Sequence, residues 1–292
     1  MNPQLLHSID YAMYWSDNDD PSSSACFEDE FVSDLLGGLS KHGLVIINNI
    51  NLTEDEYLKL TQIVGRPLNL PHQLVPSKLP GYPEIARVGN FDPTTGRLYH
   101  AKDAAFGEYW HHDGDFWPEG DHHIMNMLHS KIVPHAGGQT GFISTVAAYD
   151  LLDAETRREL ANSQVIVDPA NIEDFRGIAP EDWESENIGT GGPVVHPVVV
   201  DNSLEGGSPS LYLPFFDTKL KLRCGRKVSY KDLFGTLFDK DEVKYMHTWK
   251  NNQLIVWDNL KVMHRAMGGS EGKRLLWRTQ GRVSHVANRE NL

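Results

Sequence analysis

The feature that most constrains this chain is a histidine and an aspartate two positions apart, with a further histidine far downstream. The segment Tyr109–Phe116 reads YWHHDGDF and contains His111 and Asp113, and His264 follows an apolar run in the last part of the chain. Two imidazoles and one carboxylate are the ligand set of the facial triad that binds non-haem iron(II) and leaves positions open. Residues i and i+2 of an extended strand point to the same face, so we expect His111 and Asp113 to share a strand and His264 to complete the site from another strand.

The His-x-Asp pair is weak evidence by itself, because the chain contains 14 histidines. A histidine is more often a surface residue or a hydrogen-bonded core residue than a metal ligand. We assign the following to that background: His122, His123, His129, His135 and His285. His111 differs from them because it lies between Trp110 and an aspartate at strand spacing. His264 differs because it follows a strand candidate that ends in Asp258-Asn259.

The composition favours a single large globular domain with or without a lid. The chain has 292 residues, of which 40% are hydrophobic, and a net charge of −13. Phosphate binding requires clustered Lys and Arg, so this charge argues against a nucleic-acid partner. The two cysteines, Cys26 and Cys224, are too few for a disulfide framework. The sequence shows no secretory signal and no apolar run of membrane-spanning length, so we expect a cytoplasmic protein.

Patterns of apolar residues and turn residues predict the organisation of the chain. In the first part we expect a polar N-terminal arm over residues 1–25, a helix over 27–39 that ends at Gly43, a buried strand over 44–47, a helix from the capping box Thr53–Glu56 to about Val64, and a strand over 84–88. After Trp110 we expect strands over 124–130, 140–145, 194–200, 210–213, 253–257 and 274–283, and helices over 146–163 and 230–240. Residues 202–209 read as the loop of a hairpin. A stretch rich in Pro, Gly and acids indicates a lid around residues 165–192.

Several short motifs occur together, in order, over about residues 35–285. They are His42-Gly43-Leu44-Val45; Trp110-His111-His112-Asp113; Gly137-Gly138-Gln139-Thr140-Gly141-Phe142 with Ala147-Ala148-Tyr149; Val195-His196-Pro197-Val198-Val199 with Leu211-Tyr212-Leu213; and Trp257-Asp258-Asn259 with His264-Arg265-Ala266, Arg274 and Arg278. In this arrangement the chain resembles the TauD/TfdA family of dioxygenases, which use iron(II), 2-oxoglutarate and O2. The resemblance implies a mainly β fold with flanking helices, the double-stranded β-helix (jelly roll, cupin-like), as a single domain over residues 26–292.

The resemblance also implies roles for individual residues. The three candidate ligands named above would bind iron as the catalytic centre, and Thr140 would hydrogen-bond the distal carboxylate of 2-oxoglutarate. An arginine would form the ion pair with that carboxylate, since its planar fork can donate two hydrogen bonds. Family spacing favours Arg274 for 2-oxoglutarate and Arg278 for an anionic group of the substrate. The interval from His264 is one residue shorter than in the best-known members, so the division of roles between the two arginines stays open.

The tandem histidines allow two registers. His111-x-Asp113 is the pattern of hydroxylases, whereas His112-x-Gly114 is the pattern of related halogenases, in which the missing carboxylate makes room for chloride. Trp110 directly precedes His111, as in the family's Trp-His-x-Asp motif, and this favours the hydroxylase register.

The substrate is the least constrained part of the interpretation. Possible contacts are His72, Phe116, Trp117 and Arg278. For Phe116 and Trp117, ordinary core packing is an equally good reading. An arginine suggests a carboxylate, sulfonate or amino-acid-like group, and Glu108 or Asp115 near the metal would suit an ammonium group. We therefore expect a small organic acid or an amino-acid-like molecule, and a homo-oligomer stays open.

The expected reaction is hydroxylation of a C–H bond, coupled to decarboxylation of 2-oxoglutarate to succinate. Desaturation, cyclisation and halogenation share the same cofactor chemistry and remain alternatives. A catalytically silent jelly roll that binds a metal or a ligand is an alternative from another class. A zinc hydrolase would use the same ligand types but would not need Thr140 and Arg274 for a dicarboxylate.

Overall fold

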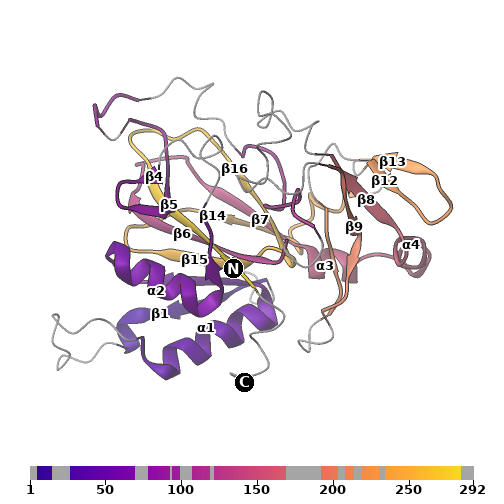
Figure 1. Ribbon diagram of the computed structural model, residues 1–292, viewed down its shortest axis with the longest axis horizontal. Helices are drawn as coiled ribbons and strands as arrows, with labels where there is room; N and C mark the ends of the chain where they lie inside the picture. Colours follow the sequence, from indigo (N-terminus) through magenta and orange to yellow (C-terminus); the bar gives the residue numbers. More distant parts are fainter. Residues whose placement is uncertain are drawn as a thin grey trace.

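Two mainly antiparallel β-sheets of unequal size face each other and form the framework of the molecule (Figure 1). The computed structural model describes residues 5–14, 27–69, 78–92, 94–98, 107–118, 122–168, 192–202, 208–213, 219–229 and 234–283. Strands predominate over helices in this part of the chain, and the expectation of a jelly roll with flanking helices is confirmed.

The large sheet has eight strands in the spatial order β1-β2-β15-β6-β17-β5-β4, with β3 beside β17. Their bounds are β1 His7–Asp10, β2 Leu44–Asn48, β3 Arg66–Pro67, β4 Lys78–Leu79, β5 Tyr82–Gly89, β6 Ile124–Ile132, β15 Leu254–Asp258 and β17 Leu275–Arg282. All pairs within it are antiparallel except the edge pair β1–β2, which is parallel.

The small sheet that faces it has the order β14-β7-β16, and two further sheets extend beyond it. The small sheet consists of β14 Lys244–His247, β7 Thr140–Ser144 and β16 Val262–Ala266. The outer sheets are β13-β12-β8-β9 and the pair β10-β11, with bounds β8 Gln164–Val167, β9 Val194–Pro197, β10 Val199–Val200, β11 Ser210–Leu211, β12 Lys219–Lys221 and β13 Lys227–Ser229. The pairing of β10 with β11 confirms the predicted hairpin.

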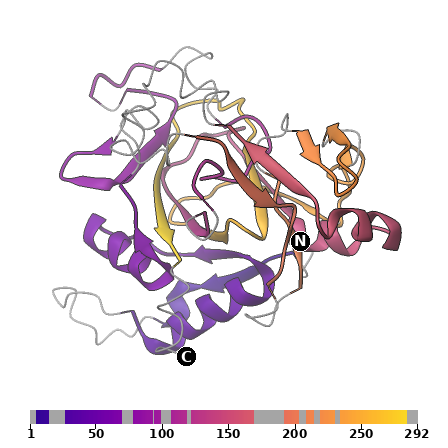
Figure 2. The same cartoon turned by 45° about the vertical axis from the view of Figure 1, so that its right-hand side comes forward.

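The helices lie outside the two sheets. They are α1 Asp29–His42, α2 Glu54–Val64, α3 Thr145–Asp150 and α4 Ala154–Leu160, with a short 3-10 turn η1 at Tyr11–Tyr14. In Figure 2, α1 and α2 cover the outer side of the large sheet, and α4 lies on the opposite side of the molecule. Helix α2 begins with the predicted capping box, in which Thr53 and Glu56 satisfy each other's backbone N–H groups.

Strand alternation divides the apolar residues among three cores. The core between the two sheets contains Phe142 and Trp257, both nearly or fully buried. On the other face of the small sheet, Ile143 and Met263 belong to a second core with α3, α4 and the outer strands. A third core fills the space between the large sheet and helices α1 and α2. Because side chains alternate along β7 and β16, the small sheet packs on both faces and its strands are rigidly placed.

Four sequence-based expectations need correction. Residues 5–14 of the predicted polar arm belong to the fold, since β1 pairs with β2 and Ile9 is buried beneath α1. The helix expected over 146–163 is two helices, because Asp153 caps a new helix by accepting a hydrogen bond from the backbone N–H of Thr156. Residues 235–240, expected to be helical, form turns. Of the predicted lid, residues 169–191 lie outside the described part, and Gln164–Val167 forms β8.

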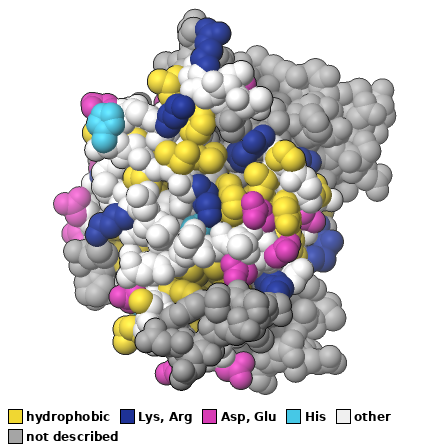
Figure 3. Space-filling model, turned by 90° about the vertical axis from the view of Figure 1, so that its left-hand side faces the viewer, with side chains coloured by type: hydrophobic (Ala, Val, Ile, Leu, Met, Phe, Trp, Pro, Cys, Tyr) yellow, Lys and Arg dark blue, Asp and Glu magenta, His cyan; other side chains and the backbone are white. Residues whose placement is uncertain are grey.

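The described surface is of mixed character. Figure 3 shows one face on which basic, acidic and apolar side chains are interspersed. Among the described residues, no helix combines the length and the apolar character that a membrane crossing requires.

The capping box of α2 offers a direct test of the fold. We expect Thr53→Ala to lower the free energy of unfolding by about 1 kcal/mol, because an N-terminal N–H of the helix loses its acceptor. For a domain of this size the melting temperature would fall by roughly 2–4 °C, measured by circular dichroism. Thr53→Ser keeps the hydroxyl and should melt like the wild type; an equal loss in both variants would contradict the capping role.

Candidate active site

The three predicted metal ligands come together between the two sheets. Their ligand atoms all lie within 4.8 Å of one another. Asp113 Oδ1 is 3.8 Å from His111 Nε2, and Asp113 Oδ2 is 3.5 Å from His264 Nε2. Ligands at right angles around a metal at 2.1 Å are about 3 Å apart, so small side-chain shifts suffice to hold one ion. The arrangement is that of a facial triad of two histidines and one carboxylate.

The backbone places these residues differently from the expected pair on one strand. His111 forms an isolated bridge with His264, in which each backbone N–H donates to the other's carbonyl, over 3.2 and 3.0 Å. Asp113 instead lies in a turn that continues through Gly114, whose φ is 68°. A side chain at position 114 would also collide with Trp117, since a Cβ would lie 2.4 Å from its ring. Glycine is therefore required by the turn that presents the carboxylate.

The two tandem histidines have different surroundings. His112 is 1% exposed, its ring lies 4.8 Å from the ring of Tyr212, and its Nδ1 donates to the backbone oxygen of Asn259. Only His111 shares the ligand cluster with Asp113 and His264 among the described residues. This geometry supports the His111-x-Asp113 register over the halogenase register.

Hydrogen bonding and charge prepare the cluster for a metal ion. His111 Nδ1 donates to the backbone oxygen of Tyr109 over 2.7 Å, which leaves the Nε2 lone pair for coordination. Burial alone would raise the pKa of Asp113, but Arg278, His264 and His111 outweigh burial and hold this pKa below its usual range. Burial and the neighbouring His111 lower the pKa of His264. A neutral imidazole and an ionised carboxylate are the forms that bind a metal, so these residues fit iron(II).

Arg278 contacts the carboxylate of the cluster directly. Its Nη2 lies 2.7 Å from Asp113 Oδ2, and both side chains are largely buried. The sequence interpretation placed Arg278 at the substrate or at 2-oxoglutarate, and the structure shows it paired with Asp113. A guanidinium has five N–H donors, so this ion pair leaves others for a further anion.

Arg274 and Thr140, the residues predicted to bind 2-oxoglutarate, both have side-chain donors that no hydrogen bond among the described residues occupies. Arg274 precedes β17, its Nε donates to the backbone oxygen of Gly138 over 3.1 Å, and burial lowers its pKa to about 10. Among the described residues, no carboxylate forms an ion pair with Arg274. Thr140 is 3% exposed and its Oγ1 accepts a hydrogen bond from the indole of Trp249 over 3.0 Å, so its own O–H proton remains available. A half-buried cation with no counter-ion among the described residues favours binding of an anionic group.

The other expected substrate contacts are only partly visible. His72 lies outside the described residues. Phe116 and Trp117 are buried, and Arg282 stacks 4.7 Å from the ring centre of Trp117, so the described environment of Trp117 is internal packing. Asp115 is 1% exposed and its backbone oxygen accepts a hydrogen bond from His196. Glu108 lines a groove on the outer side of the small sheet. The roles of these residues as substrate contacts remain predictions.

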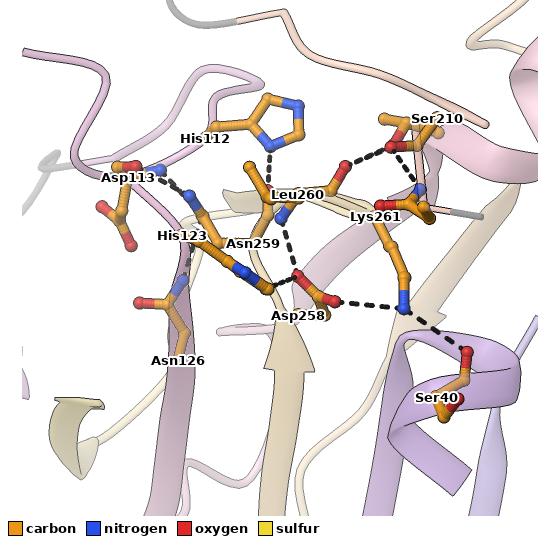
Figure 4. Close-up of polar contacts among 12 residues, drawn as sticks. Ser40, His112, Asp113, His123, Asn126, Ser210, Asp258, Asn259, Leu260 and Lys261 are labelled. Carbon is orange, nitrogen blue, oxygen red and sulfur yellow. Dashed lines mark hydrogen bonds and ion pairs between the residues drawn. The ribbon is translucent and has the colours of Figure 1, made fainter. Parts of the chain in front are cut away.

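The turn between β15 and β16 contributes residues to which the sequence interpretation assigned no role. Figure 4 shows this turn, Asp258–Lys261, surrounded by polar side chains from several parts of the chain. Asp258 is 1% exposed and lies 3.1 Å from His123 Nε2 and 3.3 Å from Lys261 Nζ. Asn259 hydrogen-bonds the backbone of Asp113. Asp258 and Asn259 were noted as part of a motif, but their contacts come from residues distant in sequence and could not be predicted from spacing.

A jelly roll with two histidines and one carboxylate between its sheets defines the class of mononuclear non-haem oxygenases. Residues 13–280 match the family described as "Taurine catabolism dioxygenase TauD, TfdA family". The chain belongs to this family. Its members are iron(II)- and 2-oxoglutarate-dependent dioxygenases, so the expected family, the oxidoreductase class and the co-substrates are confirmed at this level.

Curated relatives agree with this assignment. The chain is 25% identical over 280 residues to pentalenolactone F synthase of Streptomyces avermitilis, a match that covers 87% of this chain and 86% of the relative. It is 28% identical over 188 residues to the Streptomyces arenae protein of the same name, covering 58% of this chain and 59% of that relative. It is 25% identical over 182 residues to (S)-phenoxypropionate/alpha-ketoglutarate-dioxygenase of Sphingobium herbicidovorans, covering 59% and 61%. The chain thus spans about three fifths of the length of some relatives and most of another.

Solved structures show the same fold. One of AAD-2 in complex with Mn(II) and N-oxalylglycine superposes with a TM-score of 0.66 at 20% identity, covering 88% of this chain and 91% of that one. A taurine dioxygenase from Burkholderia xenovorans gives 0.63 at 19% identity, covering 89% and 82%.

The buried carboxylate of the β15–β16 turn gives a stability prediction. Asp258→Asn leaves the ammonium of Lys261 buried without its counter-ion, which costs about 3–5 kcal/mol. We expect the melting temperature of the metal-free protein at pH 7 to fall by roughly 10 °C.

The same residue predicts a pH dependence. Burial alone would raise the pKa of Asp258, but His123 and Lys261 outweigh it and hold this pKa below its usual range. The stabilisation is therefore fully present above about pH 4 and is lost as the pH falls through the lowered pKa. The difference in melting temperature between wild type and Asp258→Asn should shrink on acidification below pH 4; a constant difference would contradict the ion pair.

Proposed function

We propose that this chain oxidises a C–H bond of a small organic acid, with hydroxylation as the outcome. The observation that carries the proposal is the convergence of His111, Asp113 and His264. A half-buried Arg274 that forms no ion pair with a described carboxylate supports it. When bound, iron(II) and 2-oxoglutarate supply activation of O2 coupled to decarboxylation of 2-oxoglutarate to succinate. The protein supplies the binding, the orientation and the electrostatic environment.

The residues divide these tasks in the following way. His111, Asp113 and His264 hold the metal, and Tyr109 fixes the tautomer of His111 through its backbone oxygen. Arg274 and Thr140 bind the distal carboxylate of 2-oxoglutarate, because the half-buried Arg274 and the buried Thr140 both have unused donors. Arg278 holds Asp113 and offers its remaining donors to an anion near the metal.

Two features support an organic acid as the substrate. Relatives carry names with acidic substrates, phenoxypropionate and 2,4-dichlorophenoxyacetate. Arg278 places positive charge at the metal cluster. An amino acid is less well supported, because Asp115 is almost fully buried and Glu108 lines a groove on the outer side of the small sheet.

Desaturation, cyclisation and halogenation are alternative outcomes of the reaction, and analysis of the product distinguishes them. A product that forms only with chloride would indicate halogenation.

The cofactor assignment is tested by anaerobic titration of the iron(II)-loaded protein with 2-oxoglutarate. We expect a weak visible charge-transfer band that saturates in the wild type and is absent in Asp113→Ala, while both proteins remain folded by circular dichroism. A folded, iron-loaded wild type without this band would favour the silent jelly roll.

Succinate release with 2-phenoxypropionate, but not with the uncharged 2-phenoxypropanol, would then support an acidic substrate.

The two arginines are separated by the same titration. Arg274→Ala should weaken 2-oxoglutarate binding by about 10- to 100-fold, since a charge-assisted hydrogen-bonded pair contributes about 1.5–3 kcal/mol. Arg274→Lys keeps the charge but not the planar fork and should lie between the wild type and Arg274→Ala. If Arg278→Ala shows the larger loss of 2-oxoglutarate affinity, the roles of the two arginines are exchanged.

A further inference from the structure

Asn259 contacts the backbone of Asp113 on both sides of its Cα. The Asn259 amide Nδ2 donates to the Asp113 carbonyl oxygen over 2.7 Å, and the Asp113 backbone N–H donates to Asn259 Oδ1 over 2.9 Å. One side chain thus forms the two hydrogen bonds that a neighbouring strand residue forms in an antiparallel ladder. Asp113 lies in a turn, where no regular strand pairs with it.

Asn259 is itself fixed before it contacts Asp113. Its backbone N–H donates to the carbonyl of Ile124 on β6 over 3.0 Å, and its carbonyl accepts from His112 Nδ1. The preceding residue, Asp258, closes the turn by accepting from the backbone N–H of Leu260 over 2.9 Å. Asn259 therefore offers its amide from a position set by backbone hydrogen bonds on both sides.

Buried charges fix the turn to the rest of the fold. The Asp258 carboxylate contacts His123 and Lys261, and Lys261 Nζ also donates to the backbone oxygen of Ser40 near the end of α1 over 3.4 Å (Figure 4). Both Asp258 and Lys261 are at most 4% exposed. Such a pair is costly to separate, so the turn has one well-defined position relative to α1 and β6.

The same β15–β16 connection also controls the two histidines. His264 lies on β16, directly after the turn, and its backbone pairs with that of His111. The β15–β16 connection thus sets the position of His264 through the chain itself. It sets the position of His111 through backbone pairing and that of Asp113 through the Asn259 amide. The Asn259 contact is the one of the three that depends on a single side chain.

We infer that Asn259 is a positioning residue for the metal site, which holds Asp113 so that its carboxylate faces His111 and His264. The inference rests on the proposed function, since it concerns the binding of the same metal. Partners that orient metal ligands typically contribute 10- to 100-fold to metal affinity.

The chain offers a matched control at the other end of β15. Gln253 precedes this strand as Asn259 follows it, is 5% exposed, and also uses both ends of its amide. Its Oε1 accepts from the backbone N–H of Lys250 over 2.7 Å and its Nε2 donates to Asn48 Oδ1 over 2.7 Å. Gln253→Ala removes a comparable buried amide that has no contact with the metal ligands.

The test is a titration of the apo protein with Mn(II) alone, with free Mn(II) followed by electron paramagnetic resonance. We expect Asn259→Ala to weaken Mn(II) binding about 10- to 100-fold and Gln253→Ala to leave it unchanged. Amide hydrogen exchange of the apo protein gives a second readout, in which residues 111–115 should exchange faster in Asn259→Ala and not in Gln253→Ala. If Asn259→Ala does not fold, Asn259→Ser keeps a small polar group but cannot reach both backbone groups, and the same loss is expected.

The outcomes separate the inference from the proposed function. Wild-type affinity for Mn(II) in Asn259→Ala, or an equal loss in Gln253→Ala, would overturn the positioning role alone. If the wild type does not bind Mn(II), or if its binding survives in His264→Ala, the metal site itself is wrong and the inference falls with it.

Discussion

The connection between β15 and β16 is the element on which the site depends, and a buried ion pair holds its turn. β15 belongs to the large sheet and β16 to the small sheet, so this turn joins the two halves of the jelly roll. Asp258 and Lys261, at either end of the turn, are buried and paired. A buried ion pair is not in itself a strong source of stability, because desolvation offsets the attraction. What it provides here is a single geometry for the turn, from which β16 continues toward His264.

The charges of the predicted site are only partly balanced among the described residues. Asp113 faces the cation Arg278 and two imidazoles, whereas the Arg274 side chain donates to the backbone oxygen of Gly138 and forms no ion pair with a described carboxylate. A metal dication would add positive charge at Asp113, and a dicarboxylate would supply a negative charge that no described residue provides at Arg274. Binding of the two together is therefore electrostatically more favourable than binding of either one, which accords with an enzyme that uses iron(II) and 2-oxoglutarate as a pair.

The local signals in the sequence predicted the regular elements well. The capping box at Thr53 gave the start of α2, and apolar runs gave most strands of the large sheet. The same signals failed where long-range contacts decide the structure. Ile9 was assigned to a polar arm because acidic residues follow it, yet it is buried in a sheet. The cap at Asp153 was missed because a helical apolar period continues across it. The role of Asn259 depends on a turn distant in sequence, so no local pattern could reveal it.

The pair His111 and Asp113 was selected on the premise of a shared strand, and the structure brings them together by a different route. On a strand, both side chains would point to one face because of the pleat. Here a bridge to β16 holds His111, and a turn that needs a positive φ at Gly114 presents Asp113. The turn explains why a glycine directly follows the carboxylate. In the halogenase register, the same glycine would mark the position of a missing metal ligand. Because a turn lacks the ladder of hydrogen bonds that fixes a strand, the carboxylate needs a substitute for that ladder, and the Asn259 amide provides it.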